Sequence, residues 1–136
     1  IYGCQNEDGG ISYSSKSMGS SRPAITAAAL AALYNAGDYD SKYVPPMWAY
    51  SKKHLHNLGH DRYGHWHYTY LYYSQVVYRQ GADSWKPYRD RIYNRLVESQ
   101  LDDGSWKANN IGGVYTTAIN LTILQLDAGF LPIYQR

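Results

Sequence analysis

Two helical sequence patterns alternate along this chain. Three stretches, centred near Thr26, Leu71 and Thr117, are apolar or aromatic nearly all round, which is typical of helices enclosed by other helices. Each gap between them holds one stretch that is apolar on one side and charged on the other. The centres recur at intervals of about 45 residues, and a regular interval of this length predicts repeated helical hairpins.

The alternation predicts three inner helices and two outer helices. A proline near the start and a glycine after the end mark the first helix, at Pro23 and Gly37. The last stretch is rich in β-branched residues, which would also suit a strand, but its length and its place in the alternation favour a helix. The predicted bounds are 22–36, 65–80 and 114–126 for the inner helices and 43–58 and 84–99 for the outer helices.

These helices predict an all-α fold in two layers. An inner helix that is apolar all round can bury its surface only against neighbouring hairpins, so inner helices form one layer and water-facing helices the other. We expect residues 1–136 to form one domain of about two and a half hairpins. So few hairpins leave open apolar edges. We therefore expect a fragment or C-terminal part of a longer protein, or a chain that another copy covers.

A polar turn with Gln, two residues, Asp and Gly occurs twice in the chain. Asp and Gly suit a tight turn, and we interpret the two turns as equivalent corners between an outer helix and the next inner helix. At the second corner, we expect the Gln side chain to bond exposed helix-end groups and a Trp ring to cover that contact. The residues are Gln5, Asp8 and Gly9 in the first corner and Gln100, Asp103, Gly104 and Trp106 in the second.

The second turn, "QLDDGSW", resembles the QW motif of the repeat family that includes squalene cyclases and protein prenyltransferases. The first turn, "QNEDGGI", matches the Gln, Asp and Gly positions but has Ile11 where the motif has Trp. The closing "LQLDAGFLPIYQR" is also similar to the C-terminal part of uncharacterised bacterial proteins with these repeats. The resemblance implies an α/α toroid, of which this chain would be a partial ring.

The catalytic residues of that family do not occur in this chain. Squalene cyclases protonate their substrate with a DxDD motif, whereas Asp102 and Asp103 belong to the turn, and Asp38 and Asp40 lack the remaining acid. Protein prenyltransferases hold zinc with Asp, Cys and His, but the lone Cys4 lies in an N-terminal turn outside any matching context. The sequence also has no Gly-rich phosphate loop and no GxSxG motif. We predict no catalytic residue and no cofactor.

The composition argues against several classes of partner. The net charge is +2 and no run of Lys or Arg concentrates it, which disfavours nucleic acid. No apolar run reaches the roughly 20 residues that a membrane-spanning helix needs. The 16 tyrosines against one phenylalanine give nearly every aromatic ring a hydroxyl group, which suits a partly wet cavity or an interface.

All five histidines fall between residues 54 and 67. This spacing suggests a metal site, yet the rings of a His-x-His pair on one helix diverge, and the only nearby carboxylate is Asp61. We predict no metal ion and favour structural roles. In that interpretation His54 to His60 cap the end of the outer helix, and His65 and His67 line the core.

His65, Tyr68 and Tyr72 lie at positions i, i+3 and i+7 of the middle inner helix and share one face. If that face looks into a central cavity, an imidazole beside phenol groups can bind a polar ligand or carry out acid–base chemistry. If it packs on a neighbouring inner helix, its hydroxyl groups bond within the protein. The sequence allows both.

The starts of the inner helices are expected to gather at one end of the ring. Arg22 opens the first helix and Tyr115 the last, and helix starts attract anions. Arg22 therefore has two possible roles. It could bind an anionic head group, or its side chain could donate a hydrogen bond to a loop carbonyl. The candidate ligand-binding residues are Arg22, His65, His67, Tyr68, Tyr72 and Tyr115.

The sequence favours a non-catalytic binding or assembly module with a cavity or interface lined by tyrosine and histidine. Its partner would be another copy of itself or the rest of a longer toroid, and a hydrophobic, isoprenoid-like ligand is a further candidate. The alternative is part of an isoprenoid (terpenoid) cyclase or prenyltransferase whose catalytic residues lie outside this chain. A carbohydrate- or peptide-processing enzyme is disfavoured, because the inner helices carry no pair of carboxylates.

Overall fold

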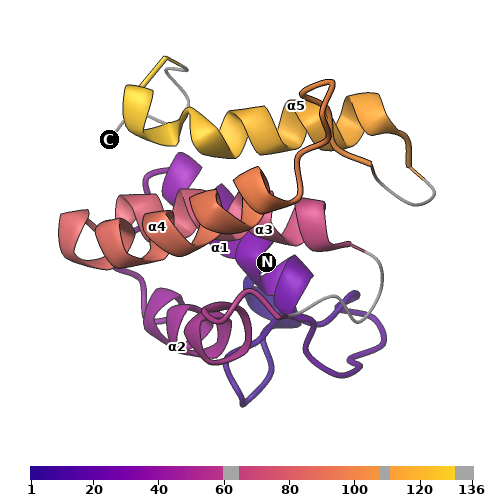
Figure 1. Ribbon diagram of the computed structural model, residues 1–136. Coiled ribbons are helices and arrows are strands. Elements are labelled where there is room, and N and C mark those ends of the chain that lie inside the picture. Colours follow the sequence, from indigo (N-terminus) through magenta and orange to yellow (C-terminus); the bar gives the residue numbers. More distant parts are fainter. Residues whose placement is uncertain (60–64, 108–110, 131–136) are drawn as a thin grey trace.

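The computed structural model describes residues 1–59, 65–107 and 111–130, which form a helical protein (Figure 1). These ranges contain no β-strand, only an isolated bridge between Gln5 and Ile11. The all-α prediction is confirmed. The α-helices are α1 (Pro23–Asn35), α2 (Val44–Leu55), α3 (Trp66–Arg79), α4 (Ala82–Glu98) and α5 (Gly113–Leu124), and short 3-10 helices cover Tyr2–Cys4 and Leu126–Ala128.

The helix bounds lie close to the predicted ones, and the largest difference is at α2, which ends at Leu55 instead of 58. Pro23 occupies the first position of α1, where its missing N–H costs no helical hydrogen bond. Gly37 follows α1 with a φ of +81°, a left-handed conformation that commonly ends helices. Among the described residues, no helix has both the length and the apolar character needed to cross a membrane.

The inner helices α1 and α3 run side by side in the same direction. Arg22 at the start of α1 and His65 at the start of α3 line one cavity. At the other end, the side-chain amide of Gln80 donates a hydrogen bond to the hydroxyl group of Tyr34. The two helices are therefore aligned start to start and end to end.

The helix α5 also follows the direction of α3. α4 returns antiparallel to α3 after a tight turn at Gly81, whose φ is +106°. Just before α5, Trp106 contacts the end of α4 at Leu96, and just after α5, Asp127 pairs with Arg89 near the start of α4. Because α5 is antiparallel to α4, all three inner helices point the same way.

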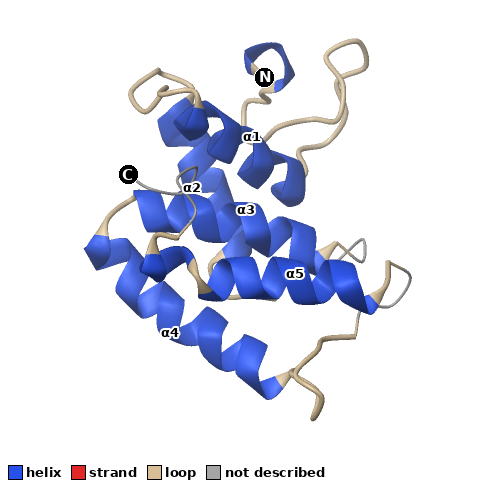
Figure 2. Ribbon diagram, turned by 90° about the horizontal axis from the view of Figure 1, so that it is seen from above, coloured by secondary structure: helices blue, strands red, loops and turns tan. Residues whose placement is uncertain are grey.

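The helices are arranged in two layers. α3 packs on both α1 and α5, while α2 packs on α1, and α4 packs on α3. Figures 1 and 2 show α5 beside α3, with α2 on the other side of the molecule. The two-layer prediction agrees with this packing. Continuation of the layers into a closed ring stays a prediction.

Buried tyrosines join the inner layer to the outer layer. Tyr70, Tyr73 and Tyr88 are fully buried, at 0% exposure. The hydroxyl group of Tyr70 donates to the carbonyl oxygen of Leu55 across 3.2 Å, and the hydroxyl groups of Tyr88 and Ser74 lie 2.9 Å apart. Burial raises the pKa of Tyr73 and Tyr88, so both phenols stay protonated at neutral pH. These three tyrosines therefore form part of a hydrogen-bonded core.

The two polar turns share two hydrogen bonds, although Gln5 also donates to the carbonyl oxygen of Tyr43 across 3.0 Å. The side-chain amide of Gln5 donates to the carbonyl oxygen of Gly9 across 3.2 Å, and that of Gln100 donates to Gly104 across 2.8 Å. The two glycines have φ values of +85° and +82°, a conformation that glycine adopts without steric cost. In each turn the Asp carboxylate accepts the backbone N–H two residues later. The two corners are structurally equivalent.

The residue after each corner donates its backbone N–H to a threonine near the start of the following inner helix. The backbone N–H of Ile11 donates to the hydroxyl group of Thr26 across 2.8 Å, and that of Trp106 donates to Thr117 across 3.1 Å. Ile11 is 3% exposed and Trp106 is 2% exposed. Ile11 therefore occupies the place at the first corner that Trp106 has at the second.

The contact with the helix end belongs to Trp106 and not to Gln100. The indole N–H of Trp106 donates to the carbonyl oxygen of Leu96 in the last turns of α4. The amide of Gln100 instead donates back to Gly104 within its own turn. The expected role of Gln100 was wrong because its side chain is used to close the turn, and the longer indole side chain reaches the helix.

The helix α5 is not enclosed on all sides. Thr116 and Asn120 are fully buried, but Val114 is 89% exposed and Leu121 is 42% exposed. No described element of the chain packs against this face, so it is an open apolar edge of the kind expected for so few hairpins.

Candidate functional site

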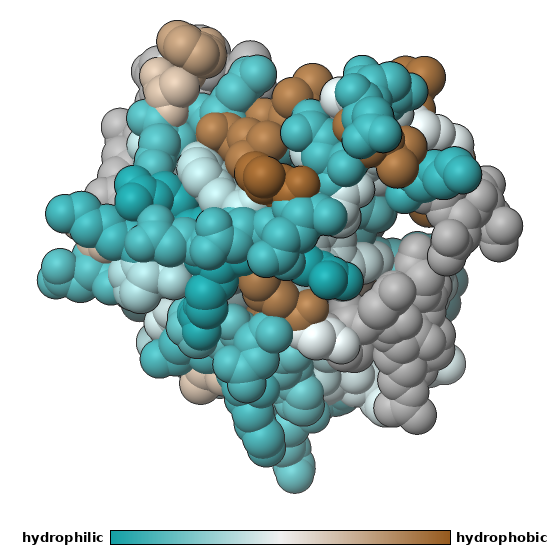
Figure 3. Space-filling view, in the orientation of Figure 1, coloured by the Kyte–Doolittle hydropathy of each residue, from teal (hydrophilic) through white to brown (hydrophobic). Residues whose placement is uncertain are grey.

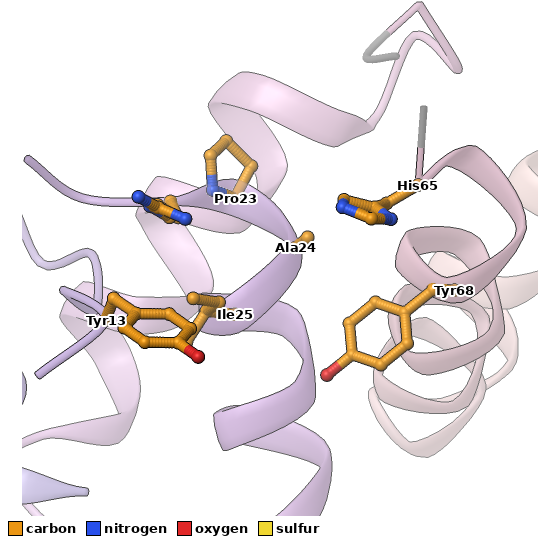
Figure 4. A pocket seen from close by; sticks show the side chains of 7 residues that line it. Tyr13, Pro23, Ala24, Ile25, His65 and Tyr68 are labelled. Atoms are coloured by element: carbon orange, nitrogen blue, oxygen red, sulfur yellow. The ribbon is translucent and has the colours of Figure 1, made fainter. Parts of the chain in front are cut away.

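A cavity of about 300 Å³ lies between the starts of α1 and α3. Figure 4 shows His65 and Tyr68 projecting from α3 toward α1, with Tyr13 and Ile25 on the other side. The arrangement follows from the parallel packing of the two helices, which brings their first turns together. The lining residues are Tyr13, Arg22, Pro23, Ala24, Ile25, His65 and Tyr68.

The α1 side of the cavity combines a cation with an apolar wall. The backbone N–H of Arg22 donates to the carbonyl oxygen of Ile11 across 3.0 Å, which positions the chain as it enters α1. The guanidinium group of Arg22 lies over the ring of Tyr13, 5.3 Å from its centre, a cation–π contact. Ala24 and Ile25 in the first turn present aliphatic surface to the cavity. This side can contact an apolar group and an anionic group at once.

The α3 side of the cavity begins at His65. Its carbonyl oxygen accepts the hydroxyl group of Thr69 across 2.8 Å, and α3 starts at the next residue. The side chain of His65 is exposed at the cavity and does not line the core, so that prediction was wrong. The reason is that the residue before a helix projects from its end, where no neighbouring helix covers it.

Three phenol groups meet beside the cavity. The rings of Tyr68 and Tyr72 pack edge to face with their centres 4.9 Å apart. Burial raises the pKa of Tyr68, and the neighbouring phenols Tyr72 and Tyr115 raise it further. Burial and the nearby Tyr72 also raise the pKa of Tyr115. At neutral pH, Tyr68 and Tyr115 therefore keep their protons and can donate hydrogen bonds.

His67 is separated from the other predicted ligand-binding residues. Its Nδ1 lies 3.0 Å from the side-chain oxygen of Asn120 in α5. It lines a different cavity of about 310 Å³, together with Trp66 and Trp106. His65 and His67 diverge because positions i and i+2 at a helix start do not share a face. Of the six candidates, Arg22, His65 and Tyr68 line the cavity, and Tyr72 packs its ring on Tyr68. Tyr115 is not among the lining residues.

The two other described histidines, His54 and His56, make separate contacts. His54 is exposed and packs its ring on Tyr50, with ring centres 4.4 Å apart. His56 makes side-chain contacts with Tyr73 and Arg91 instead of capping α2 through its ring. The predicted role of His60 lies outside the described residues. Within the described ranges, no three His, Cys, Asp or Glu side chains lie close enough to hold a metal ion.

Tyr13 is a lining residue that the sequence analysis missed. It is 76% exposed and lies in a serine-rich loop, nine positions before Arg22. A loop residue has no helical period to predict its direction. The only sequence signal is an aromatic side chain in an otherwise polar segment.

The described lining of the cavity offers groups that can bind a ligand. Its seven described residues contribute a guanidinium group, an imidazole and two phenols, but no carboxylate and no thiol. No protein-family model, curated protein or solved structure matches the chain, so its function is inferred from this geometry.

Proposed function

We propose that this chain is a non-catalytic binding or assembly module of the squalene cyclase and prenyltransferase repeat type. Its ligand site is the cavity between the starts of α1 and α3. The ligand is an amphipathic small molecule, with an apolar, isoprenoid-like body and an anionic head group.

One observation carries this proposal: Arg22, His65 and Tyr68 meet around a cavity whose other wall is aliphatic. The apolar part of a ligand would lie against Ala24 and Ile25, where burial of carbon groups is favourable. The head group would lie near the guanidinium group, which binds carboxylates and phosphates well. The starts of two parallel helices add to the attraction for an anion.

The alternative, a part of an isoprenoid cyclase or prenyltransferase, stays a prediction. It requires catalytic residues outside this chain, and none of the described residues that line the cavity is a carboxylic acid. We therefore favour binding without turnover.

A matched pair of probes tests the proposal. Farnesyl phosphate and farnesol share the same apolar body and differ only in the head group. Titration by calorimetry should show tighter binding of the phosphate. Arg22→Gln should weaken phosphate binding about tenfold and affect the alcohol little, because only the phosphate uses the charge. Tyr68→Phe should weaken both a few-fold through loss of one hydroxyl group.

Lys86→Gln is the control for charge, since Lys86 is an exposed cation on α4 outside the cavity. It should leave both affinities unchanged. The proposed ligand site is wrong if neither probe binds up to about 1 mM. It is also wrong if Lys86→Gln lowers the affinity for farnesyl phosphate as much as Arg22→Gln does.

A further inference from the structure

A second cavity, of about 310 Å³, lies between the start of α3 and the end of α4. Ligand pockets commonly have volumes of about 300 Å³ or more, so this α3–α4 cavity can hold a small molecule. No described residue lines both it and the α1–α3 cavity. The residues that give it its chemistry are Leu58, Trp66, His67, Arg95, Trp106 and Lys107.

Two tryptophans form the aromatic part of this lining, and a backbone carbonyl group fixes each of them. The indole N–H of Trp66 donates to the carbonyl oxygen of Leu58 across 3.2 Å. That of Trp106 donates to Leu96 across 2.8 Å. Because both N–H groups bond within the protein, the rings contribute apolar surface to the cavity. Another aromatic ring packs well on such a surface, edge to face or offset-stacked.

The charged groups of the lining are cations. Arg95 belongs to the end of α4 and Lys107 follows the second corner, and both residues are exposed to water. Neither takes part in an ion pair among the described residues, and no carboxylate belongs to the described lining. The cavity therefore favours an anion, and a carboxylate can accept two parallel hydrogen bonds from an arginine.

A buried amide orients His67 at the cavity. The Nδ1 atom of His67 lies 3.0 Å from the side-chain oxygen of Asn120, which can only accept, so Nδ1 donates. Asn120 is 0% exposed, and its amide nitrogen has no hydrogen-bond partner among the described residues. An unsatisfied buried group lowers stability. The one bond that this amide makes is therefore the one that positions His67.

Leu58 adds backbone strain at the same cavity. Its φ is +57°, and it is the one described residue other than glycine with a positive φ. This left-handed conformation is unfavourable for a residue with a Cβ atom, and such strain collects at functional sites. The strained residue both lines the cavity and accepts the hydrogen bond of Trp66. Two unfavourable features, at Leu58 and Asn120, thus hold residues of one cavity.

Aromatic surface and charge occur together at this cavity, unlike at the exposed face of α5. Figure 3 shows hydrophobic surface at the top of the molecule, where Figure 1 has α5. α5 has no charged residue that could select a ligand. The α1–α3 cavity has a cation, but no tryptophan is among its described lining residues. Of these three surfaces, the α3–α4 cavity is the one that combines indole rings with two cations.

We propose that the α3–α4 cavity is a second ligand site, which binds a planar aromatic carboxylate. The aromatic ring of the ligand lies against the indoles of Trp66 and Trp106. Its carboxylate is bound by Arg95 and Lys107. The proposal does not rest on the α1–α3 cavity, which has other lining residues and takes a ligand with an aliphatic body.

Three probes with one carbon skeleton test the ligand class by calorimetry. They are 2-naphthoate, 2-naphthylmethanol, which lacks the charge, and decahydro-2-naphthoate, which lacks the aromatic rings. The native chain should bind 2-naphthoate with a Kd below about 1 mM and the alcohol about tenfold more weakly. The saturated acid should bind about three- to tenfold more weakly, because it cannot stack.

Variants test the site. Arg95→Gln should weaken binding of 2-naphthoate about tenfold and leave the alcohol nearly unchanged. Lys86→Gln is the matched control, because Lys86 is an exposed cation on α4 that does not line the cavity. Trp66→Leu should reduce the preference for 2-naphthoate over the saturated acid, a ratio that a general loss of stability does not change. If Trp66→Leu does not fold, Arg95→Gln still decides, since it changes an exposed side chain.

Three results would each overturn the proposal. The first is no binding of 2-naphthoate up to about 1 mM, and the second is equal binding of 2-naphthoate and the alcohol. The third is a loss of 2-naphthoate affinity in Lys86→Gln or Arg22→Gln as large as in Arg95→Gln. Arg95→Gln should bind farnesyl phosphate as the native chain does, so failure of the α1–α3 site is seen separately.

Discussion

The indole N–H of Trp106 donates a hydrogen bond to the carbonyl oxygen of Leu96 across 2.8 Å. Both residues are buried, and the carbonyl group lies in the last turn of α4, where it also accepts the backbone N–H and the hydroxyl group of Ser99. The indole of Trp106 therefore shares in capping an outer helix and fills the corner that leads to α5. This corner therefore stabilises the fold and does not depend on a bound ligand.

Trp106→Ala should lower the free energy of unfolding by about 3 to 5 kcal/mol, because it removes a large buried ring and leaves a cavity. Trp106→Phe should cost less, since it keeps much of the packing and loses mainly the hydrogen bond to Leu96. Urea unfolding followed by circular dichroism measures both. A Trp106→Ala variant that unfolds like the parent would show that the corner does not depend on this ring.

Gly9 and Gly104 have the same conformation but different surroundings. At Gly104 the nearest atom to an added Cβ is the Gln100 amide nitrogen at 3.9 Å, so Gly104→Ala should cost only the left-handed backbone, about 1 to 2 kcal/mol. At Gly9 a Cβ would lie 2.5 Å from the carbonyl oxygen of Pro46. Gly9→Ala should therefore cost clearly more in the same unfolding assay, and equal costs would contradict the close packing of this corner on α2.

His56 should make stability depend on pH. Its Nε2 lies 2.6 Å from the guanidinium group of Arg91, which can only donate, so Nε2 accepts and Nδ1 carries the proton that faces Tyr73 at 3.2 Å. Burial lowers the pKa of His56, and Arg91 and Lys52 lower it further. The unfolded chain therefore takes up the proton first. The contribution of His56 to the free energy of unfolding should be fully present above the ordinary pKa of about 6.5. It should decrease as the pH falls toward the lowered pKa.

Unfolding at about pH 7.5 and about pH 5 measures this effect. The loss of stability between the two should be smaller in His56→Gln than in the parent, because the titrating group is gone. His54→Gln, which changes an exposed histidine two positions earlier, should keep the full loss. If both variants lose stability equally, His56 is not the group responsible.

Ser74 and Tyr88 should be energetically coupled. Their hydroxyl groups lie 2.9 Å apart and both residues are fully buried, so either single deletion leaves one hydroxyl group without this partner. Tyr88→Phe and Ser74→Ala should each cost about 1 to 3 kcal/mol, and the double variant should cost less than their sum by about 1 kcal/mol. Strict additivity in a double-mutant cycle would mean that the bond contributes nothing.

The helix bounds were predictable because proline, glycine and hydrophobic period mark them locally. Pro23 and Gly37 delimit α1 whatever packs around it. The sequence predicted an open apolar edge but not which helix carries it. The sequence of α5 is apolar all round, as for an enclosed helix, and the presence of a neighbour on each side is not a local property.

The part of the candidate site that lies on one face of a single helix was predictable from residue spacing. His65 and Tyr68 share a face, and the parallel start of α1 brings Arg22 to them. His67 was misplaced because an i+2 position points elsewhere, toward Asn120. Tyr13 reaches the cavity through a loop, whose path depends on contacts distant in sequence such as that between Arg22 and Ile11.

The edge of the inner layer at α1 is covered within the chain, which limits the size of any assembly that uses this layer. An open-ended filament needs two complementary free edges on each subunit, so that each addition creates a new site. Here Ala29 and Leu33 are already packed within the chain, and the free lateral edge of the described inner layer is at α5. Two copies of this chain that met through this edge would leave no free edge in the described inner layer, so such association would stop at two.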